Sequence, residues 1–364
     1  MKIKEKLTVG RAGLDSLFRS AVALLLSLLV SAVIMAACGY NPIQAYGAIF
    51  TGSFGSLRGI TQTLTQATPL IFTGLAFTFA KKASLINLGV EGQMYMGALG
   101  AVLIALPAMG LPGPVHLMLA ILGGMAFGGA YAAIIGFLKV KFGSNEVVAG
   151  FMLNSIATYI VGYLLNGPLL AEGSNIAQTA RVAESAWMPR IFSKYQVTYA
   201  VFLAVAACIF VAWFMKKTVT GYEIRCVGMN KDASETAGIR VGRSLVIAMC
   251  VSGAIAGLAG VNQVLGVDRR LINEFSPGYG FNGIAVSALA AENPVGTILA
   301  GVIFGVLRAG VMELNRTTNI PIEFVDVIQA MVVVFVSAPL LIRNLGGHLS
   351  RLKPARGAKG GAVQ

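Results

Sequence analysis

The feature that most constrains this chain is a series of long apolar stretches separated by short polar or basic segments. A helix needs about 20 mostly apolar residues to cross a bilayer. Only 12% of the 364 residues are charged and 56% are hydrophobic, whereas a soluble domain carries about 25% charged residues. The composition therefore excludes a soluble enzyme and a disordered chain. The ten candidate membrane segments are Ala21–Cys38, Leu64–Ala80, Leu85–Leu106, Val115–Leu138, Val147–Leu165, Tyr199–Met215, Leu245–Leu265, Phe281–Ala291, Val295–Met312 and Ile322–Ile342.

The distribution of basic residues predicts how these segments are oriented. The chain has 28 Lys and Arg against 15 Asp and Glu, a formal net charge of +13. With the N-terminus in the cytoplasm and all ten segments crossing, 20 of the 28 fall on the cytoplasmic side, as the positive-inside rule requires. We therefore expect both termini in the cytoplasm, with a basic N-terminal segment 1–20, a transmembrane domain 21–343 and a basic tail 344–364. The basic clusters form no aromatic-interleaved stripe such as single-strand binders use, which argues against nucleic-acid binding.

Residues that could support catalysis or nucleotide hydrolysis are sparse. The two histidines, His116 and His348, lie far apart in the sequence, and no Gly-Lys-Ser or Gly-Lys-Thr occurs that could form a phosphate-binding loop. The four cysteines have no paired spacing and predict neither a disulfide nor a zinc site. We expect no catalytic residues, no metal and no cofactor, so any ATP that drives this protein is used by another subunit.

The segment 216–243 is the longest loop on the predicted cytoplasmic side. Within it, Asn230 can cap a short helix from Lys231 to Ala237, and Gly238 can adopt the left-handed conformation that ends a helix. A helix of two turns is marginal by itself. We therefore expect this helix to dock on another molecule.

The residues of this loop, GYEIRCVGMNKDASETAGI, resemble the coupling loop of permease subunits of bacterial ABC importers of the ribose and branched-chain amino acid type. Two further segments are similar to those of the simple-sugar and nucleoside branch, whose members resemble guanosine and general nucleoside uptake systems. They are NLGVEGQMYMGA at Asn87–Ala98 and FNGIAVSALAAENPVG at Phe281–Gly296. The resemblance extends over almost the whole chain from the first apolar stretch to the last. Its motifs identify the family but leave the solute open between nucleosides and simple sugars.

This resemblance implies an all-α polytopic membrane protein with about ten transmembrane helices and the type II ABC importer permease fold. In such importers two permeases pair, a cytoplasmic ABC ATPase drives them, and an extracellular binding protein or lipoprotein delivers the solute. We expect a heterodimer with a related permease. The family's coupling loop docks on the ATPase, and in this chain that role falls on Arg225, Gly228, Asn230, Asp232, Ala233, Glu235, Ala237, Gly238 and Ile239.

Polar residues within apolar segments are candidates for the solute path, because polar groups at membrane depth tend to face the bundle interior or a wet cavity. One such cluster, with glycines between its members, begins at Asn87, and a second interruption, Ala290–Pro294, falls in the other half of the chain. Broken helices in matching halves point to a transport site. The alternative role for these residues is hydrogen bonding between helices. The predicted path residues are Asn87, Glu91, Gln93, Asn154, Asn262, Gln263 and Asn282.

Two further segments have predicted roles. The outer loop 166–198 is long enough to be functional, and we expect it to dock the solute-binding protein or to cover the pore. Glycine pairs four residues apart predict close packing of helices; they are Gly124 and Gly128, Gly253 and Gly257, and Gly301 and Gly305.

The sequence therefore predicts a translocation subunit of an importer and not an enzyme. The alternative is an ion-coupled secondary transporter of a small polar solute, for which Glu91 is the strongest candidate coupling group. That alternative leaves the capped cytoplasmic helix unexplained.

Overall fold

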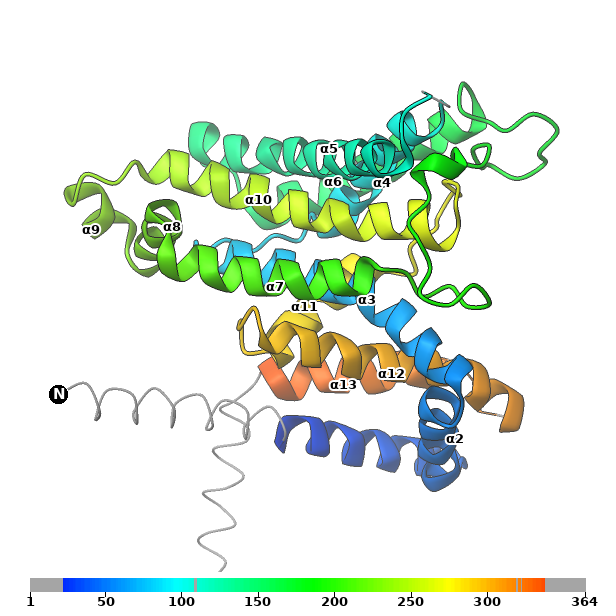
Figure 1. Ribbon diagram of the computed structural model, residues 1–364. Coiled ribbons are helices and arrows are strands. Elements are labelled where there is room, and N and C mark those ends of the chain that lie inside the picture. Colours follow the sequence, from blue (N-terminus) through cyan, green and yellow to red (C-terminus); the bar gives the residue numbers. More distant parts are fainter. Residues whose placement is uncertain (1–21, 108–109, 319, 322, 338–364) are drawn as a thin grey trace, which may run out of the picture.

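The computed structural model describes residues 22–107, 110–318, 320–321 and 323–337; the predicted basic segments 1–20 and 344–364 lie outside this range. Within the described residues the regular structure is helical apart from two isolated β-bridges. The long helices form an elongated bundle (Figure 1). The long connection 167–199 lies at one end, here called the loop end. The short helices α8 (Val219–Met229) and α9 (Lys231–Thr236) lie at the other, here called the α9 end.

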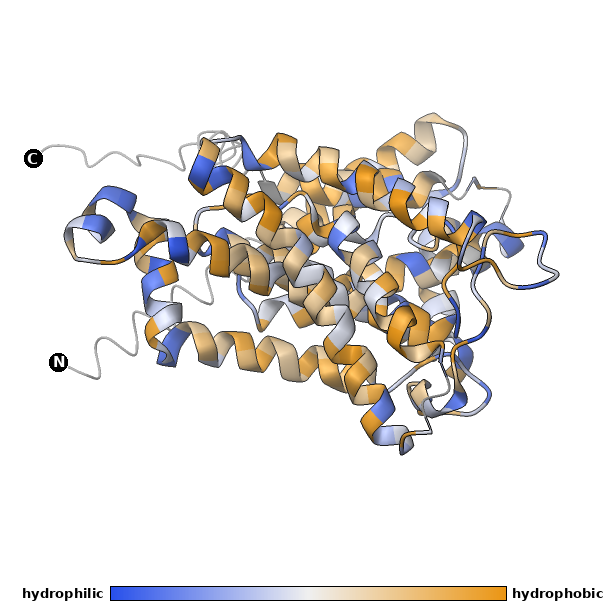
Figure 2. Cartoon of the chain, turned by 90° about the horizontal axis from the view of Figure 1, so that it is seen from above, coloured by the Kyte–Doolittle hydropathy of each residue, from blue (hydrophilic) through white to orange (hydrophobic). Residues whose placement is uncertain are grey.

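The long apolar helices occupy the predicted membrane segments. Across the described residues, five helices are long and apolar enough to cross a bilayer: α5 (Gly113–Phe142), α6 (Glu146–Asn166), α7 (Ala200–Lys217), α10 with its continuation (Val241–Val267) and α12 (Gly296–Thr317). Hydrophobic residues dominate the middle of the bundle, and many hydrophilic residues gather near its ends (Figure 2). The shorter apolar helices are Val22–Ala37, α4 (Val90–Ala105) and Phe324–Phe335 within α13 (Glu323–Ser337).

Two helices near the start of the chain differ from the predicted segments. Helix α2 (Pro42–Phe54) was not predicted, although Asn41 caps it and Pro42 occupies its first turn, which is a recognisable start signal. Helix α3 spans Leu57–Lys81, and most of its residues are buried. Its first half is rich in threonine. The predicted segment, which relied on apolar residues alone, therefore starts too late, at Leu64.

Helices α4 and α11 (Tyr279–Leu289) each start inside the bundle and are therefore too short to cross a bilayer. We call them the half-helices. At 1.5 Å per residue, α4 is about 24 Å long and α11 about 17 Å, against a hydrocarbon core of about 30 Å. The chain enters the bundle through the non-helical segment 82–89 before α4, and through segment 268–278 before α11. These segments come from the α9 end and the loop end respectively, so the two half-helices run in opposite directions.

The predicted break at Ala290–Pro294 is present, and a further interruption that was not predicted precedes α11. Ala290–Pro294 forms the turn between α11 and α12, with positive φ angles of 49° at Ala291 and 57° at Glu292. The interruption inside the bundle precedes α11, at Gly278, whose φ is 81°. A polar turn such as Glu292-Asn293-Pro294 is conspicuous between two apolar stretches. Segment 268–278 is polar too, but hydropathy alone assigns it to an outer loop.

The predicted close packing at glycine pairs is confirmed. A Cβ added at Gly128 on α5 would lie 2.5 Å from the carbonyl oxygen of Gly253 on α10 and 3.0 Å from Cα of Gly257. A Cβ at Gly305 on α12 would lie 2.7 Å from Cβ of Ala67 on α3. In lipid such backbone contacts replace the hydrophobic drive that packs helices in water.

We predict that Gly128→Leu destabilises the bundle, because the larger side chain must push α5 away from α10. Overpacking of this kind costs about 1–3 kcal/mol. The midpoint of thermal unfolding of the purified protein in detergent should fall clearly below that of wild type. Gly47→Leu on α2 is the matched control, because a Cβ at that position meets nothing within 4 Å. Equal midpoints for the two variants would contradict the assigned packing.

Candidate functional site

The two half-helices meet end to end, and the contact between them is made by Glu91. This residue lies in the first turn of α4, and its Oε2 accepts a hydrogen bond of 2.6 Å from the backbone N–H of Gly280 in the first turn of α11. A Cβ at Gly280 would lie 2.5 Å from the Glu91 nitrogen, so the approach requires glycine. Helix N-termini carry partial positive charge, which stabilises a carboxylate that is only 7% exposed. We call this contact the half-helix junction.

Side chains from outside α4 satisfy its N-terminal N–H groups. The N-cap residue is Gly89, which has no side chain to serve as a cap. Asn87 Oδ1 accepts from the Gly89 N–H at 3.1 Å, and Asn154 Oδ1 on α6 accepts from the Gly92 N–H at 2.8 Å. Asn154 also donates through Nδ2 to the carbonyl of Leu88 at 2.8 Å. These bonds replace the missing cap and hold the non-helical segment against α6.

Asn87 and Gln93 form a reciprocal amide pair beside the junction. Each Nδ2 or Nε2 donates to the other side chain's oxygen at 2.9 Å. Asn87 Nδ2 also donates to Ser252 Oγ on α10 at 2.8 Å, and Ser252 donates to the carbonyl of Ala76 on α3 at 2.7 Å. This network connects α3, α4 and α10, and the side chains of Asn87, Gln93 and Ser252 have no exposed surface.

The remaining predicted path residues lie in two other places. Asn262 and Gln263 begin a π-helical turn, Asn262–Val267, that continues α10 towards the loop end, and Asn262 Oδ1 accepts from Thr198 Oγ1 at 3.0 Å. Asn282 on α11 donates to the carbonyl of Gly278 at 3.0 Å.

The structure therefore gathers Asn87, Glu91, Gln93 and Asn154 at the junction and leaves Asn262 and Gln263 apart from it. Of the seven, Asn282 alone is more than marginally exposed in this conformation. Their contact with solute stays a prediction.

A second polar group beside the junction was not among the predicted path residues. Arg308 lies in the middle of α12, donates through Nη2 to the carbonyl of Pro277 at 2.8 Å, and stands 5.2 Å from the ring centroid of Tyr279. The Tyr279 hydroxyl donates to Gln66 Oε1 on α3 at 2.6 Å. An arginine in the middle of an apolar segment is the signal that could have identified this group, since charges at membrane depth are costly and tend to be functional.

The predicted short helix at the α9 end is confirmed as α9. Asn230 caps it by accepting from the Ala233 N–H at 3.0 Å, and Gly238 ends it with a φ of 80°. Except for Ser234, every residue of α9 is exposed.

Helix α8, in contrast, is anchored to the bundle. Ile224 and Val227 are buried, and a Cβ on Gly228 would overlap the carbonyl oxygen of Lys82, in the turn after α3. Two of the predicted coupling residues, Arg225 and Gly228, thus lie on the anchored helix α8. The others lie on or beside the exposed helix α9. Between α8 and α9 lies a groove lined by Tyr222, Cys226, Met229, Asn230, Ala233, Ser234, Ala237 and Ile239.

The connection at the loop end is pinned to the segment before α11. The Thr179 N–H donates to the carbonyl of Leu271 at 2.9 Å, and the guanidinium of Arg269 stacks on Trp187 at 3.8 Å from the ring centroid. Burial, together with the guanidinium groups of Arg190 and Arg181, lowers the pKa of Arg269. The loop end therefore carries a cluster of closely spaced arginines.

Comparison with known proteins identifies the family. Residues 59–337 match the family model described as branched-chain amino acid transport system / permease component, so the chain belongs to this family of transport permeases. It is 33% identical to the guanosine ABC transporter permease protein NupP of Bacillus subtilis over 93% of this chain and 98% of the relative. It is 32% identical to the nucleoside ABC transporter permease protein NupB of Lactococcus lactis over 93% and 95% of the two chains. Identity to a glucose ABC transporter permease protein of Haloferax volcanii is 33% over 86% and 85%.

We predict that Glu91→Ala lowers both stability and uptake, because the N-terminus of α11 loses its acceptor. A hydrogen bond to a charged group contributes about 1.5–3 kcal/mol. Glu91→Gln keeps an oxygen that can accept from Gly280 and should lie between wild type and Glu91→Ala. Thermal unfolding in detergent and solute uptake by cells measure the two effects. A Glu91→Ala protein as stable as wild type would show that the junction does not hold the half-helices together.

Proposed function

We propose that this chain is the translocation subunit of an ATP-driven ABC importer that takes up nucleosides or simple sugars. The family match supports the permease role, and the relatives named as guanosine, nucleoside and glucose permeases support this class of solute. No choice between a guanosine-like nucleoside and a sugar follows from these names, since all three relatives are about equally similar to the chain.

The observation on which this proposal rests is the pairing of an exposed, capped α9 with an anchored α8. A two-turn helix that leaves nearly all its side chains exposed gains little from its own chain, so its order is explained best by a partner that covers it. The sequence lacks the Gly-Lys-Ser or Gly-Lys-Thr of a phosphate loop. We therefore assign the ATPase to a separate cytoplasmic subunit that docks on segment 216–243.

The excess of Lys and Arg at the α9 end supports a cytoplasmic position for this end and for both termini. In this orientation the loop end faces outward. Its arginine cluster offers a surface for an acidic region of an extracellular solute-binding lipoprotein, steered there by opposite charge.

A second, related permease completes the transporter in this proposal. The chain resembles two guanosine ABC transporter permease proteins of Bacillus subtilis, NupP and NupQ, although NupQ is matched over only 68% of this chain. Their coexistence in one organism supports a heterodimer of two different permeases.

A series of contacts connects α9 to the half-helix junction. Gly228 on α8 packs against the backbone of Lys82, where the non-helical segment 82–89 begins. That segment contains Asn87, whose amide bonds to Gln93, and it leads directly into Glu91. We propose that movement of α8 and α9 by the ATPase displaces this segment and thereby switches the side of the membrane to which the solute path is open.

We predict that Glu235→Arg uncouples ATP hydrolysis from uptake, because Glu235 is exposed on α9 where the ATPase is proposed to dock. Membrane insertion should be unchanged, while solute transported per ATP hydrolysed should fall at least fivefold in proteoliposomes. Lys141→Glu, an exposed charge reversal at the same end but on α5, is the control. Normal coupling in Glu235→Arg would contradict the docking assignment.

We predict that the double reversal Arg181→Glu and Lys194→Glu weakens docking of the binding protein. Both side chains are exposed at the loop end, and a reversed charge would repel an acidic partner. The solute concentration for half-maximal uptake should rise several-fold, and more steeply at low salt because surface charges are less screened there. Unchanged uptake kinetics at both salt concentrations would show that Arg181 and Lys194 do not take part in docking the binding protein.

A further inference from the structure

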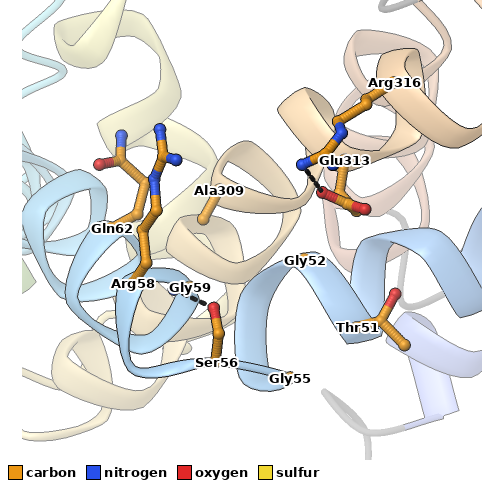
Figure 3. Close-up of a pocket in the computed structure, with 10 residues that line it drawn as sticks. All are labelled: Thr51, Gly52, Gly55, Ser56, Arg58, Gly59, Gln62, Ala309, Glu313 and Arg316. Carbon is orange, nitrogen blue, oxygen red and sulfur yellow. Dashed lines mark hydrogen bonds and ion pairs between the residues drawn. The ribbon is translucent and has the colours of Figure 1, made fainter.

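A hollow of about 540 Å³ lies between α2, α3 and α12. Figure 3 shows Arg58 and Gln62 side by side on α3, and Glu313 with Arg316 across from them on α12. The hollow lies towards the loop end, where α2 joins α3 and where α12 ends. Its volume falls within the range of small-molecule sites. The full lining is Thr51, Gly52, Gly55, Ser56, Arg58, Gly59, Gln62, Ala309, Glu313 and Arg316.

Polar side chains lead from this hollow to the half-helix junction. Arg58, Gln62 and Gln66 are four residues apart on α3 and therefore share one face of the helix. Gln66 accepts from the Tyr279 hydroxyl in the first turn of α11, the same turn in which Gly280 bonds to Glu91. We call Arg58, Gln62, Gln66, Tyr279 and Arg308 the polar ladder.

The ladder has hydrogen-bonding capacity that its own contacts do not use. Arg58 forms no ion pair with the carboxylates that the structure describes, and its side chain is exposed. The Arg308 Nε is buried and has no partner among the described residues. Gln62 and Gln66 are partly exposed, whereas Asn87, Gln93 and Asn154 use their amides in bonds between helices and have almost no exposed surface. Tyr279 is buried, and its hydroxyl positions Gln66.

We propose that the polar ladder is the solute-contacting wall of this subunit, with the hollow as its outer site. The proposal rests on the importer function proposed above. It assigns solute contact to side chains of α3, α11 and α12 in place of the predicted amides of α4, α6 and α10. The ligand is an uncharged polyhydroxylated ring, the ribose of a nucleoside or a hexose. A guanidinium donates to hydroxyl oxygens, and an amide both donates to and accepts from hydroxyl groups.

Cysteine accessibility tests this site. Gln62→Cys is made in a chain whose four natural cysteines are replaced by serine. The complete transporter is reconstituted with its ATPase, its partner permease and its solute-binding lipoprotein. A charged thiol reagent is added on the loop-end side with and without the transported solute, chosen from guanosine, adenosine, ribose and glucose by uptake of the parent transporter. We expect the solute to slow labelling of Gln62→Cys several-fold. Gln44→Cys, exposed on α2 but outside the hollow, should label equally with and without solute.

The outcomes separate this inference from the function on which it rests. If the parent transporter imports a solute but that solute leaves labelling of Gln62→Cys unchanged, the ladder is not the path. If a nucleoside monophosphate protects better than the nucleoside, the assignment of an uncharged ligand is wrong. If the parent transporter imports none of the four solutes with ATP, the proposed function itself fails, and this inference fails with it.

Uptake by two ladder variants gives a second, independent readout. Gln62→Leu and Gln66→Leu each remove a side chain that can bond to a hydroxyl, and each should reduce uptake at subsaturating solute about fivefold or more. Gln44→Leu on α2 makes the same exchange at an exposed position outside the hollow and should leave uptake unchanged. Near-normal uptake by both ladder variants would overturn the proposal even if labelling were protected.

Discussion

The arrangement of this permease depends on one buried carboxylate. Glu91 accepts from the N–H of Gly280 where two half-helices meet, and without it the first turn of α11 would present an unpaired donor inside the bundle. An ionisable group in such a place is normally costly. Here the first turns of two helices surround the carboxyl group, and its hydrogen bond to Gly280 joins the two interrupted elements.

Because the half-helices enter from opposite ends, their meeting point is also where the two parts of the chain are joined. The segment before α4 is held by Asn87, Gln93 and Asn154, while the segment before α11 is held by Arg308 through the carbonyl of Pro277. Non-helical backbone inside a membrane bundle is tolerated where it is buried in protein or lines a water-filled cavity. Both breaks therefore need side chains that replace the missing backbone bonds, which explains the polar residues Asn87, Gln93 and Asn154 in otherwise apolar surroundings.

This requirement changes how polar residues in the sequence should be interpreted. Asn87 and Gln93 are conspicuous in an apolar stretch, yet in this conformation they are entirely engaged with one another and with Ser252. Gln62 and Gln66 belong to a threonine-rich helix whose start the apolar pattern did not detect. The conspicuous Asn87 and Gln93 are thus structural in this conformation, whereas the partly exposed Gln62 and Gln66 lie in a helix that the apolar pattern describes poorly.

The sequence by itself determined the helical membrane class, the approximate positions of the apolar helices, the capped α9 and the glycine contacts. These depend on neighbouring residues, through hydrophobic length, capping side chains and small-residue spacing. Only the tertiary structure decided that Glu91 meets Gly280 and that the Tyr279 hydroxyl bonds to Gln66. Such contacts join residues about 190 or more positions apart, and hydrophobic periodicity along the chain contains no information about which distant backbone group a buried side chain will satisfy.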